Sequence, residues 1–367
     1  MKKLLLASVA LSGLAFAAPA HAEIDLEVGG YFKGYGVFVD QDETAGSSVN
    51  DFDFVRDTEI HLGGETTLDN GLTVGAHFEF DVDGADADAE IDESYVYFSG
   101  NWGRVNFGNE DGAAYLLQVA APSADSNIDG IRQYVQPVNY ATLGAAAPST
   151  ATVTSGGIDY DMDPSGKSDK LTYLSPIFSG FQVGASYSPD TDAAGAKSGV
   201  GTDDVAGTIG ATYELAGRYE GQFQNVGVIV GAGYSHGDLE ESTATTDDRQ
   251  AWNVGLDLDI GPFGVGVIYR EDNGGADGAA ADDEETFVIG VDYTTGPFKL
   301  GASYYDQTNT FAVDGDDTTR YSGGVSYEYG PGMSFRGSIG YIEHEDASAA
   351  NSDVDATYVT IGTQINF

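Results

Sequence analysis

A two-residue alternation of apolar and polar side chains recurs along most of this chain and constrains its fold more than any other feature. The stretch AWNVGLDLDI (251–260) places Trp252, Val254, Leu256, Leu258 and Ile260 on one face of a strand. FKLGASYY (298–305), TFVIGVDYT (286–294) and YVTIGTQINF (358–367) repeat the pattern. Because successive side chains of a strand point to opposite faces, each strand is expected to separate two different environments.

The links between these segments are of two alternating kinds. Some are tight turns, such as LDNG (68–71), GNWG (100–103), GPFG (261–264), TGPF (295–298) and YGPG (329–332). Others are long, acidic and rich in small residues, such as EDNGGADGAAADDEE (271–285) and EHEDASAANSD (343–353). Every hairpin is therefore expected to have a short end and a long end.

Counting the alternating segments predicts about sixteen strands of about ten residues each, a number and length typical of outer-membrane barrels. Within lipid, only a closed barrel lets strands satisfy every backbone group without leaving a sheet edge. We therefore expect an all-β fold, a transmembrane antiparallel β-barrel with short periplasmic turns and long extracellular loops. The expected strand centres lie near Gly34, Ile60, Ala76, Val96, Asn106, Thr172, Val183, Gly210, Val228, Val254, Val265, Ile289, Ala302, Val325, Gly337 and Thr360.

Aromatic side chains recur near both ends of the apolar face in several strands. Such pairs predict two girdles at the membrane interfaces. The alternative is that Tyr and Phe are simply good strand formers. The pairs are Phe32 and Phe38, Phe263 and Tyr269, Phe287 and Tyr293, and Phe298 and Tyr304.

The N-terminal stretch MKKLLLASVALSGLAFAAPAHA (1–22) has the composition of a secretory signal peptide. Lys2 and Lys3 precede an apolar run from Leu4 to about Ala18, and Ala20-His21-Ala22 is a small-residue cleavage pattern. We expect cleavage after residue 22 and a barrel domain over residues 23–367. An N-terminal membrane anchor is the alternative, but the run is shorter than the roughly 20 residues of a spanning helix.

Charge and cysteine content narrow the classes of partner. The formal net charge is −44, from 15 Lys and Arg against 59 Asp and Glu. Such an excess argues against nucleic acid or anionic lipid as a partner and favours the attraction of cations. The chain contains no Cys, so its rigidity must come from hydrogen bonding and packing rather than disulfides.

One link, over residues 109–168, differs from the others in its length and in its apolar content. It is far longer than ordinary loops, which indicates either a function or disorder. A disordered insert would be poorer in apolar residues than this one. The residues that could pack are Leu116, Leu117, Val119, Ile131, Tyr134 and Val135. Because a barrel of sixteen strands leaves an open lumen, we expect this third long loop to fold inward and narrow it.

Four segments together resemble the trimeric, sixteen-stranded general diffusion porins of Gram-negative bacteria. They are EIDLEVGGYFKGYGVFVD (23–40), TEIHLGGETTLDNGLTVGAHFEFD (58–81), IDESYVYFSGNWGRVNFGNEDGAAY (91–115) and YVTIGTQINF (358–367). The resemblance implies a passive channel for small hydrophilic solutes and ions in the outer membrane of the cell. It also implies that Phe367 is the signal read by the outer-membrane assembly machinery.

The same resemblance implies a homotrimer embedded in outer-membrane lipid and lipopolysaccharide. Its protomers would pack through strands near the closure of the barrel. Gly30, Gly34 and Gly36, on the apolar parity of the first strand, could allow close approach there.

In such porins the third loop carries acidic residues that face a basic wall across the constriction of the pore. By resemblance the loop acids are Asp111, Asp125 and Asp129, with Asp159, Asp161 and Asp163 further along. The basic wall candidates are Lys33, Arg104 and Arg336, with His61 and His77 nearby. The chain departs from the pattern where arginines are expected and has Glu59, Glu65, Glu79 and Asp81 instead. An acidic constriction of this kind predicts a preference for cations.

Asp159, Asp161 and Asp163 also have the alternate spacing by which a calcium loop supplies its first oxygens. Pro164 stands where an EF-hand needs glycine, and no glutamate occupies the twelfth position, so that motif fails. Carboxylate oxygens suit Ca²⁺, which leaves a calcium site open as an alternative to a solvated acidic stretch. No other cofactor is expected.

An enzyme is a remote alternative. An outer-membrane hydrolase would need a nucleophile and a base. The sequence has one GxSxG match, at residues 233–237, but it lies within an alternating strand segment and not at the strand-to-helix turn that such a nucleophile requires. A lone histidine inside a barrel is more often structural or pH-responsive than catalytic. A channel specific for a sugar or another nutrient is the closer rival, and an aromatic track along the lumen would distinguish it from a general pore.

Overall fold

The computed structural model describes residues 24–42, 48–83, 90–143, 158–191, 200–277, 283–310, 313–345 and 353–367. The signal peptide expected over residues 1–22 lies outside the described residues and stays a prediction.

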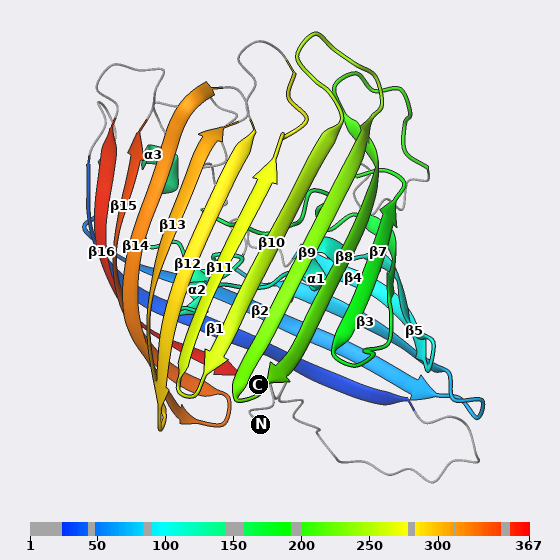
Figure 1. Ribbon diagram of the computed structural model, residues 1–367, viewed down its shortest axis with the longest axis horizontal. Coiled ribbons are helices and arrows are strands. Elements are labelled where there is room, and N and C mark those ends of the chain that lie inside the picture. Colours follow the sequence, from blue (N-terminus) through cyan, green and yellow to red (C-terminus); the bar gives the residue numbers. More distant parts are fainter. Residues whose placement is uncertain are drawn as a thin grey trace.

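Sixteen strands of the described chain form one closed antiparallel barrel, as the sequence predicts (Figure 1). Each strand pairs with its neighbours in chain order, and β1 closes the barrel by pairing with β16, with Tyr31 opposite Asn366 and Gln41 opposite Ala356. Every expected strand centre falls inside an observed strand. The strands are β1 (Asp25–Gln41), β2 (Phe52–Thr67), β3 (Thr73–Asp81), β4 (Glu90–Gly100), β5 (Gly103–Asn109), β6 (Asp169–Leu174), β7 (Phe181–Ser188), β8 (Ile209–Phe223), β9 (Val226–Leu239), β10 (Arg249–Ile260), β11 (Phe263–Asp272), β12 (Glu284–Thr295), β13 (Phe298–Thr310), β14 (Val313–Gly330), β15 (Met333–Glu345) and β16 (Val354–Asn366).

Within its described residues, the connection between β5 and β6 contains three short helices. They are α1 (Ala113–Leu116), α2 (Ser126–Asp129) and α3 (Tyr140–Leu143). No helix in the described part of the chain has the length and apolar character to cross a membrane.

The alternation seen in the sequence separates an outer apolar face from the lumen. On β12, Phe287, Ile289 and Val291 point outward and are 37%, 40% and 44% exposed, whereas Thr286 and Val288 point inward and are buried. A strand of period two that meets lipid on one side and polar groups on the other has this pattern.

Outward-facing aromatic rings pair across neighbouring strands at two levels, as the expected girdles require. Near the tight turns, Phe263 contacts Tyr293 and Phe298 contacts Tyr327, both with ring centroids 4.9 Å apart. Toward the other end of the strands, Trp252 contacts Tyr269 at 5.2 Å and Tyr304 contacts Tyr321 at 4.9 Å. Amphipathic rings at two levels mark the boundaries of an apolar band.

The five tight turns named from the sequence all join consecutive strands at one end of the barrel, at the bottom of Figure 1. Gly261, between β10 and β11, has a φ of 63°, which a residue with a Cβ adopts only at a cost. The longer connections lie at the opposite end (Figure 1).

The apolar band predicts a depth-dependent penalty for charge on β12. Ile289→Arg, between the aromatic residues Phe287 and Tyr293 on the outer face, is expected to lower the free energy of unfolding in lipid by about 2–4 kcal/mol. Thr295→Arg, on the same face beside a tight turn, is the matched control and should cost about 0–1 kcal/mol. Denaturant titration of the barrel in vesicles measures both, and equal costs would contradict the assignment of the outer face.

Candidate functional site

The described parts of the connection between β5 and β6, residues 110–143 and 158–168, run inside the barrel rather than over its rim, and we call them the inner loop. In Figure 1 its helices α1 and α2 lie within the outline of the barrel. Ile128, Tyr160 and Met162 of this loop are completely buried. Apolar loop residues such as Val119 pack with Ile268 and Val288, two apolar side chains that point into the lumen. Burial of this apolar surface is the main force that holds the loop inside.

Glycines make room for the inner loop on the barrel wall. Lumen-facing glycines on β7 and β9–β13 lie under the loop, and we call six of them the glycine track. A Cβ at Gly290 would overlap the carbonyl oxygen of Pro122, and one at Gly255 would lie 2.8 Å from the Cβ of Val119. The loop backbone therefore approaches the strands as closely as it does because these positions lack side chains. The members of the track are Gly184, Gly231, Gly255, Gly266, Gly290 and Gly301.

Polar contacts fasten the loop to the opposite part of the wall. Arg336 on β15 donates to Asp125 at 2.7 Å, and the Tyr35 hydroxyl on β1 donates to the same carboxylate at 2.9 Å. Asp125 also accepts from the backbone N–H of Asn127 and so caps α2. Its side chain is fully buried, so its charge is compensated by several donors at once.

A second anchor lies one turn further along. Arg320 on β14 donates to the carbonyl oxygen of Ile128 at 2.9 Å and lies 3.4 Å from the Asp129 carboxylate. Burial raises the pKa of Asp129 and outweighs the opposing effect of Arg320. Asp125 and Asp129, named from the sequence as constriction acids, thus lie against the wall in contact with arginines. Their role in the constriction stays a prediction.

Arg132 binds three aspartates of the inner loop. It donates to both oxygens of Asp111, at 2.7 and 3.1 Å, and to Asp161 and Asp163 at 2.9 and 2.6 Å. Burial opposes its positive charge, but the surrounding carboxylates outweigh burial and raise the pKa of Arg132. Burial raises the pKa of Asp163.

The aspartates considered for calcium therefore already have other partners. Asp161 and Asp163 bind Arg132, whereas Asp159 accepts from the backbone N–H of Gln133 at 2.5 Å. A calcium ion at this position would have to compete with the guanidinium group. The calcium site stays a prediction.

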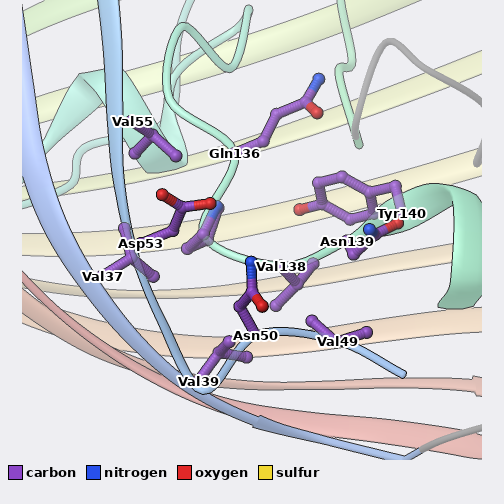
Figure 2. Close-up of a pocket in the computed structure, with 11 residues that line it drawn as sticks. Val37, Val39, Val49, Asn50, Asp53, Val55, Gln136, Val138, Asn139 and Tyr140 are labelled. Carbon is purple, nitrogen blue, oxygen red and sulfur yellow. The ribbon is translucent and has the colours of Figure 1, made fainter.

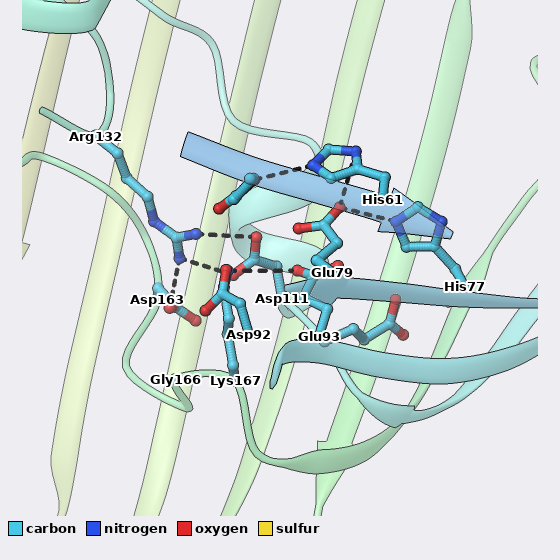
Figure 3. A network of polar contacts seen from close by, with 12 residues as sticks. His61, His77, Glu79, Asp92, Glu93, Asp111, Arg132, Asp163, Gly166 and Lys167 are labelled. Carbon is cyan, nitrogen blue, oxygen red and sulfur yellow. Dashed lines mark hydrogen bonds and ion pairs between the residues drawn. The ribbon is translucent and has the colours of Figure 1, made fainter. Parts of the chain in front are cut away.

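The facing wall, on β2–β4, carries histidines and carboxylates (Figure 3). His61 contacts Glu59 at 2.9 Å, and His77 contacts Glu79 at 2.8 Å. On β4, Glu93 pairs with Glu79 and Ile91 pairs with Phe80, so Asp92 is the extra residue between them. Such an extra residue is typical of a β-bulge, and it brings Asp92 close to Glu93 beside Glu79. No ion pair joins Glu59 or Glu79 to a Lys or Arg within the described residues.

The basic residues nearby are mostly neutralised. Lys33 pairs with Asp57 at 2.8 Å, and its ammonium group lies 3.1 Å from the ring centroid of Tyr134. Lys167 pairs with Asp92. Arg104 donates to Asn106 at 2.6 Å and lies over the Tyr97 ring. Two of these three cations are thus paired with carboxylates, and among the described residues Arg104 is the one without an ion pair.

A cavity of about 370 Å³ separates the inner loop from β1 and β2 (Figure 2). Val37, Val55 and Val138 supply apolar lining, and Asp53 supplies its one carboxylate. The lining contains no Lys, Arg or His. The cavity thus adds negative charge and no positive charge to the interior.

Sequence reasoning missed three features of this site: Arg132, Arg320 and the glycine track. Arg132 and Arg320 had no distinguishing motif, because the contacts that define them join segments far apart in the chain. The glycine track did leave a signal, since Gly255, Gly290 and Gly301 occupy the lumen parity in the middle of three strands.

The glycine track predicts that one methyl group displaces the inner loop. Gly290→Ala should strain the contact with Pro122 at a cost of about 1–3 kcal/mol. Limited proteolysis should then cleave the segment around residues 113–124 faster, with the barrel still folded. Gly63→Ala is the matched control, because a Cβ at Gly63 meets its nearest atoms at an ordinary 3.7 Å. Unchanged proteolysis of both variants would contradict the role of the track.

Glu110, at the base of the loop, predicts a pH dependence of docking. Its side chain is 2% exposed and accepts from Asn106 at 2.7 Å, and burial raises its pKa from 4.5 to about 7. The docked loop favours the protonated acid, so this contribution is fully present below about pH 4.5 and is lost as pH rises through about 7. The loss is of order 3 kcal/mol.

Hydrogen exchange of the α1 amides, corrected for intrinsic rates, measures this dependence. Protection should fall between pH 5 and pH 8 in the natural protein and fall less in Glu110→Gln, which stays neutral. The difference between the two proteins isolates Glu110 from the other acids of the loop. Identical profiles would contradict the prediction.

Comparisons with known protein families and solved structures identify the family of this barrel. A family model described as Gram-negative porin matches residues 7–347. An uncharacterized protein of Rickettsia felis is 24% identical over 282 residues, which is 70% of this chain. The chain spans 61% of that relative's length.

Solved porin structures share the fold at low sequence identity. An anion-selective porin from Comamonas acidovorans is 17% identical with a TM-score of 0.61, over 94% of this chain and 100% of that chain. OmpT, an outer membrane protein of Vibrio cholerae solved in a trimer form, is 15% identical with a TM-score of 0.62, over 94% and 99%. The barrel shares its fold with these structures, and the family model matches nearly the whole length, so this chain belongs to the Gram-negative porin family.

Proposed function

We propose that this porin is a passive, water-filled channel for small hydrophilic solutes that prefers cations. The observation that carries the preference is the wall of β2–β4, where Glu59, Glu65 and Glu79 have no Lys or Arg ion-pair partner among the described residues. Glu65 instead accepts from the Tyr97 hydroxyl at 2.6 Å. Side-chain carboxylates that line a passage favour cations and exclude anions.

The fold by itself does not decide selectivity. The Comamonas acidovorans porin has the same fold and is anion-selective. The sign of the preference must therefore come from the side chains of each chain. In this one, Arg132, Arg320 and Arg336 are bound to loop aspartates, and their positive charges are compensated locally rather than offered to a passing anion.

We further propose a homotrimer, inserted by the outer-membrane assembly machinery and surrounded by lipid and lipopolysaccharide. A hollow of about 450 Å³ on the outer surface, over β1, β2, β15 and β16, supports close packing of a second copy. Gly34 and Gly36 form its floor between Phe32, Phe54 and Phe335. Phe367, 53% exposed beside this region and joined to Gly30 by two backbone hydrogen bonds, is the proposed assembly signal.

A channel specific for a nutrient such as a sugar is the second candidate, and a row of rings favours it. Tyr134, Tyr31, His61, His77 and Tyr95 are in successive contact, with ring centroids 5.3–6.2 Å apart. Aromatic faces bind the apolar side of a sugar ring. Vesicle-swelling rates distinguish the two: a general pore gives rates proportional to solute concentration, whereas a specific channel saturates.

The charge argument predicts the outcome of a zero-current potential measurement under a KCl gradient in a planar bilayer. The natural protein should be cation-selective. The double variant Glu59→Gln/Glu79→Gln should be less so, since two carboxylates are removed from the lumen wall while side-chain size is kept.

Glu271→Gln/Glu285→Gln is the matched control, because it removes the same charge from the outer face of β11 and β12. Its potential should equal that of the natural protein. An anion-selective natural protein would overturn the charge argument and leave the channel function intact.

A further inference from the structure

His61, His77 and Glu79 converge on one point of the lumen wall (Figure 3). In the register of β2 and β3, His61 lies directly opposite Glu79. His77, two residues before Glu79 on β3, lies opposite Gly63, two residues after His61 on β2. The three side chains therefore share the lumen face at adjacent positions of a rigid, hydrogen-bonded ladder. Backbone pairing, not loop geometry, brings them together.

The spacing of their ligand atoms fits a small metal ion. The carboxylate of Glu79 lies 2.8 Å from Nε2 of His77 and 3.8 Å from Nδ1 of His61, and one ligand atom from each of the three residues lies within 4.8 Å of the others. A tetrahedral Zn²⁺ site with bonds of about 2.0–2.1 Å separates its ligand atoms by about 3.3 Å. Small side-chain rotations bring the observed distances to that value.

Glu59 orients the imidazole ring of His61 for binding a metal ion. It contacts Nε2 of His61 at 2.9 Å. A proton held on Nε2 by this carboxylate leaves the lone pair of Nδ1 directed toward Glu79. The pairing of a ligand histidine with an outer carboxylate is a recurrent feature of zinc sites.

The chemistry and exposure of the cluster favour a transition metal over calcium. Two imidazoles and one carboxylate suit Zn²⁺ and its neighbours in the first transition row, whereas Ca²⁺ and Mg²⁺ take oxygen ligands. The side chains of His61, His77 and Glu79 are 30%, 26% and 18% exposed, so an ion can enter from the lumen and keep water as a fourth ligand. Asp92, grouped with Glu59 and Glu79, adds negative charge that attracts a cation.

We propose that His61, His77 and Glu79 form a binding site for a divalent transition-metal ion such as Zn²⁺ on the wall of the pore. A bound ion there adds positive charge to the pore wall and reduces the flux of other cations. The binding step does not depend on the proposed channel function, whereas the effect on flux does.

Metal binding is tested on the purified, folded protein. Calorimetric titration with Zn²⁺, and with Co²⁺ for its visible absorption spectrum, should show one site per chain in the lumen. His61→Gln/His77→Gln should weaken binding by about tenfold or more, the loss that follows even from removing an outer-shell partner. Co²⁺ in the natural protein should give the intense absorption of a four-coordinate site, and the double variant should not.

His236→Gln is the matched control. His236 lies on the outer face of β9 with Asp238 and Asp248, which form a separate group of potential ligands. Removal of this histidine should leave the lumen site and its effect on current unchanged. If His236→Gln abolishes binding and the double variant does not, the proposal is overturned.

Current measurements separate the proposal from the channel function. Zn²⁺ should reduce the KCl current of the natural protein, and Mg²⁺ at equal concentration should not. The double variant, compared with its own zinc-free current, should lose this effect. A normal KCl current with no site-specific zinc binding would overturn the metal site and retain the channel, whereas zinc binding without any current would retain the site and overturn the channel.

Discussion

The pairing of β1 with β16 is the constraint on which the rest of the structure depends. β1 pairs with β16 on one side and with β2 on the other, so closure gives every strand of the barrel two partners and leaves no row of backbone donors at an open edge. Once the sheet is closed, alternate side chains must face lipid or lumen, and the outer face becomes an apolar band with two aromatic levels. The lumen is then wide enough to take a loop, and the inner loop fills part of it.

The inner loop stays inside because two unlike surfaces hold it. The glycine track admits its backbone on one side, with Ile268 and Val288 covered by apolar loop residues. On the other side, Arg320 and Arg336 bind Asp129 and Asp125. Apolar burial supplies most of the stabilisation, and the buried ion pairs fix the position, because a loop shifted by one residue would leave charges unpaired.

The sequence was sufficient for the barrel and insufficient for the docking of the loop. Alternation over ten residues is a local signal, so every strand centre from Gly34 to Thr360 could be assigned from its neighbours in the chain. The contacts of the inner loop are not local: Asn127 reaches Gln364, and Asp125 reaches Arg336. Nothing in the sequence around Asp125 distinguishes a buried anchor from a solvated acid. Lumen-facing glycines in consecutive strands were the one pattern that could have shown where the loop lies.

The same contacts that dock the loop also shape the charge of the passage. Each arginine bound to a loop aspartate is removed from the set of cations that could attract an anion. His61 and His77 stand where a wall arginine would otherwise neutralise Glu59 and Glu79. An imidazole can remain neutral and keep a lone pair, which a guanidinium cannot. The wall therefore combines carboxylates that lack a Lys or Arg partner among the described residues with nitrogen ligands, and this combination links the proposed preference for cations to the proposed metal site.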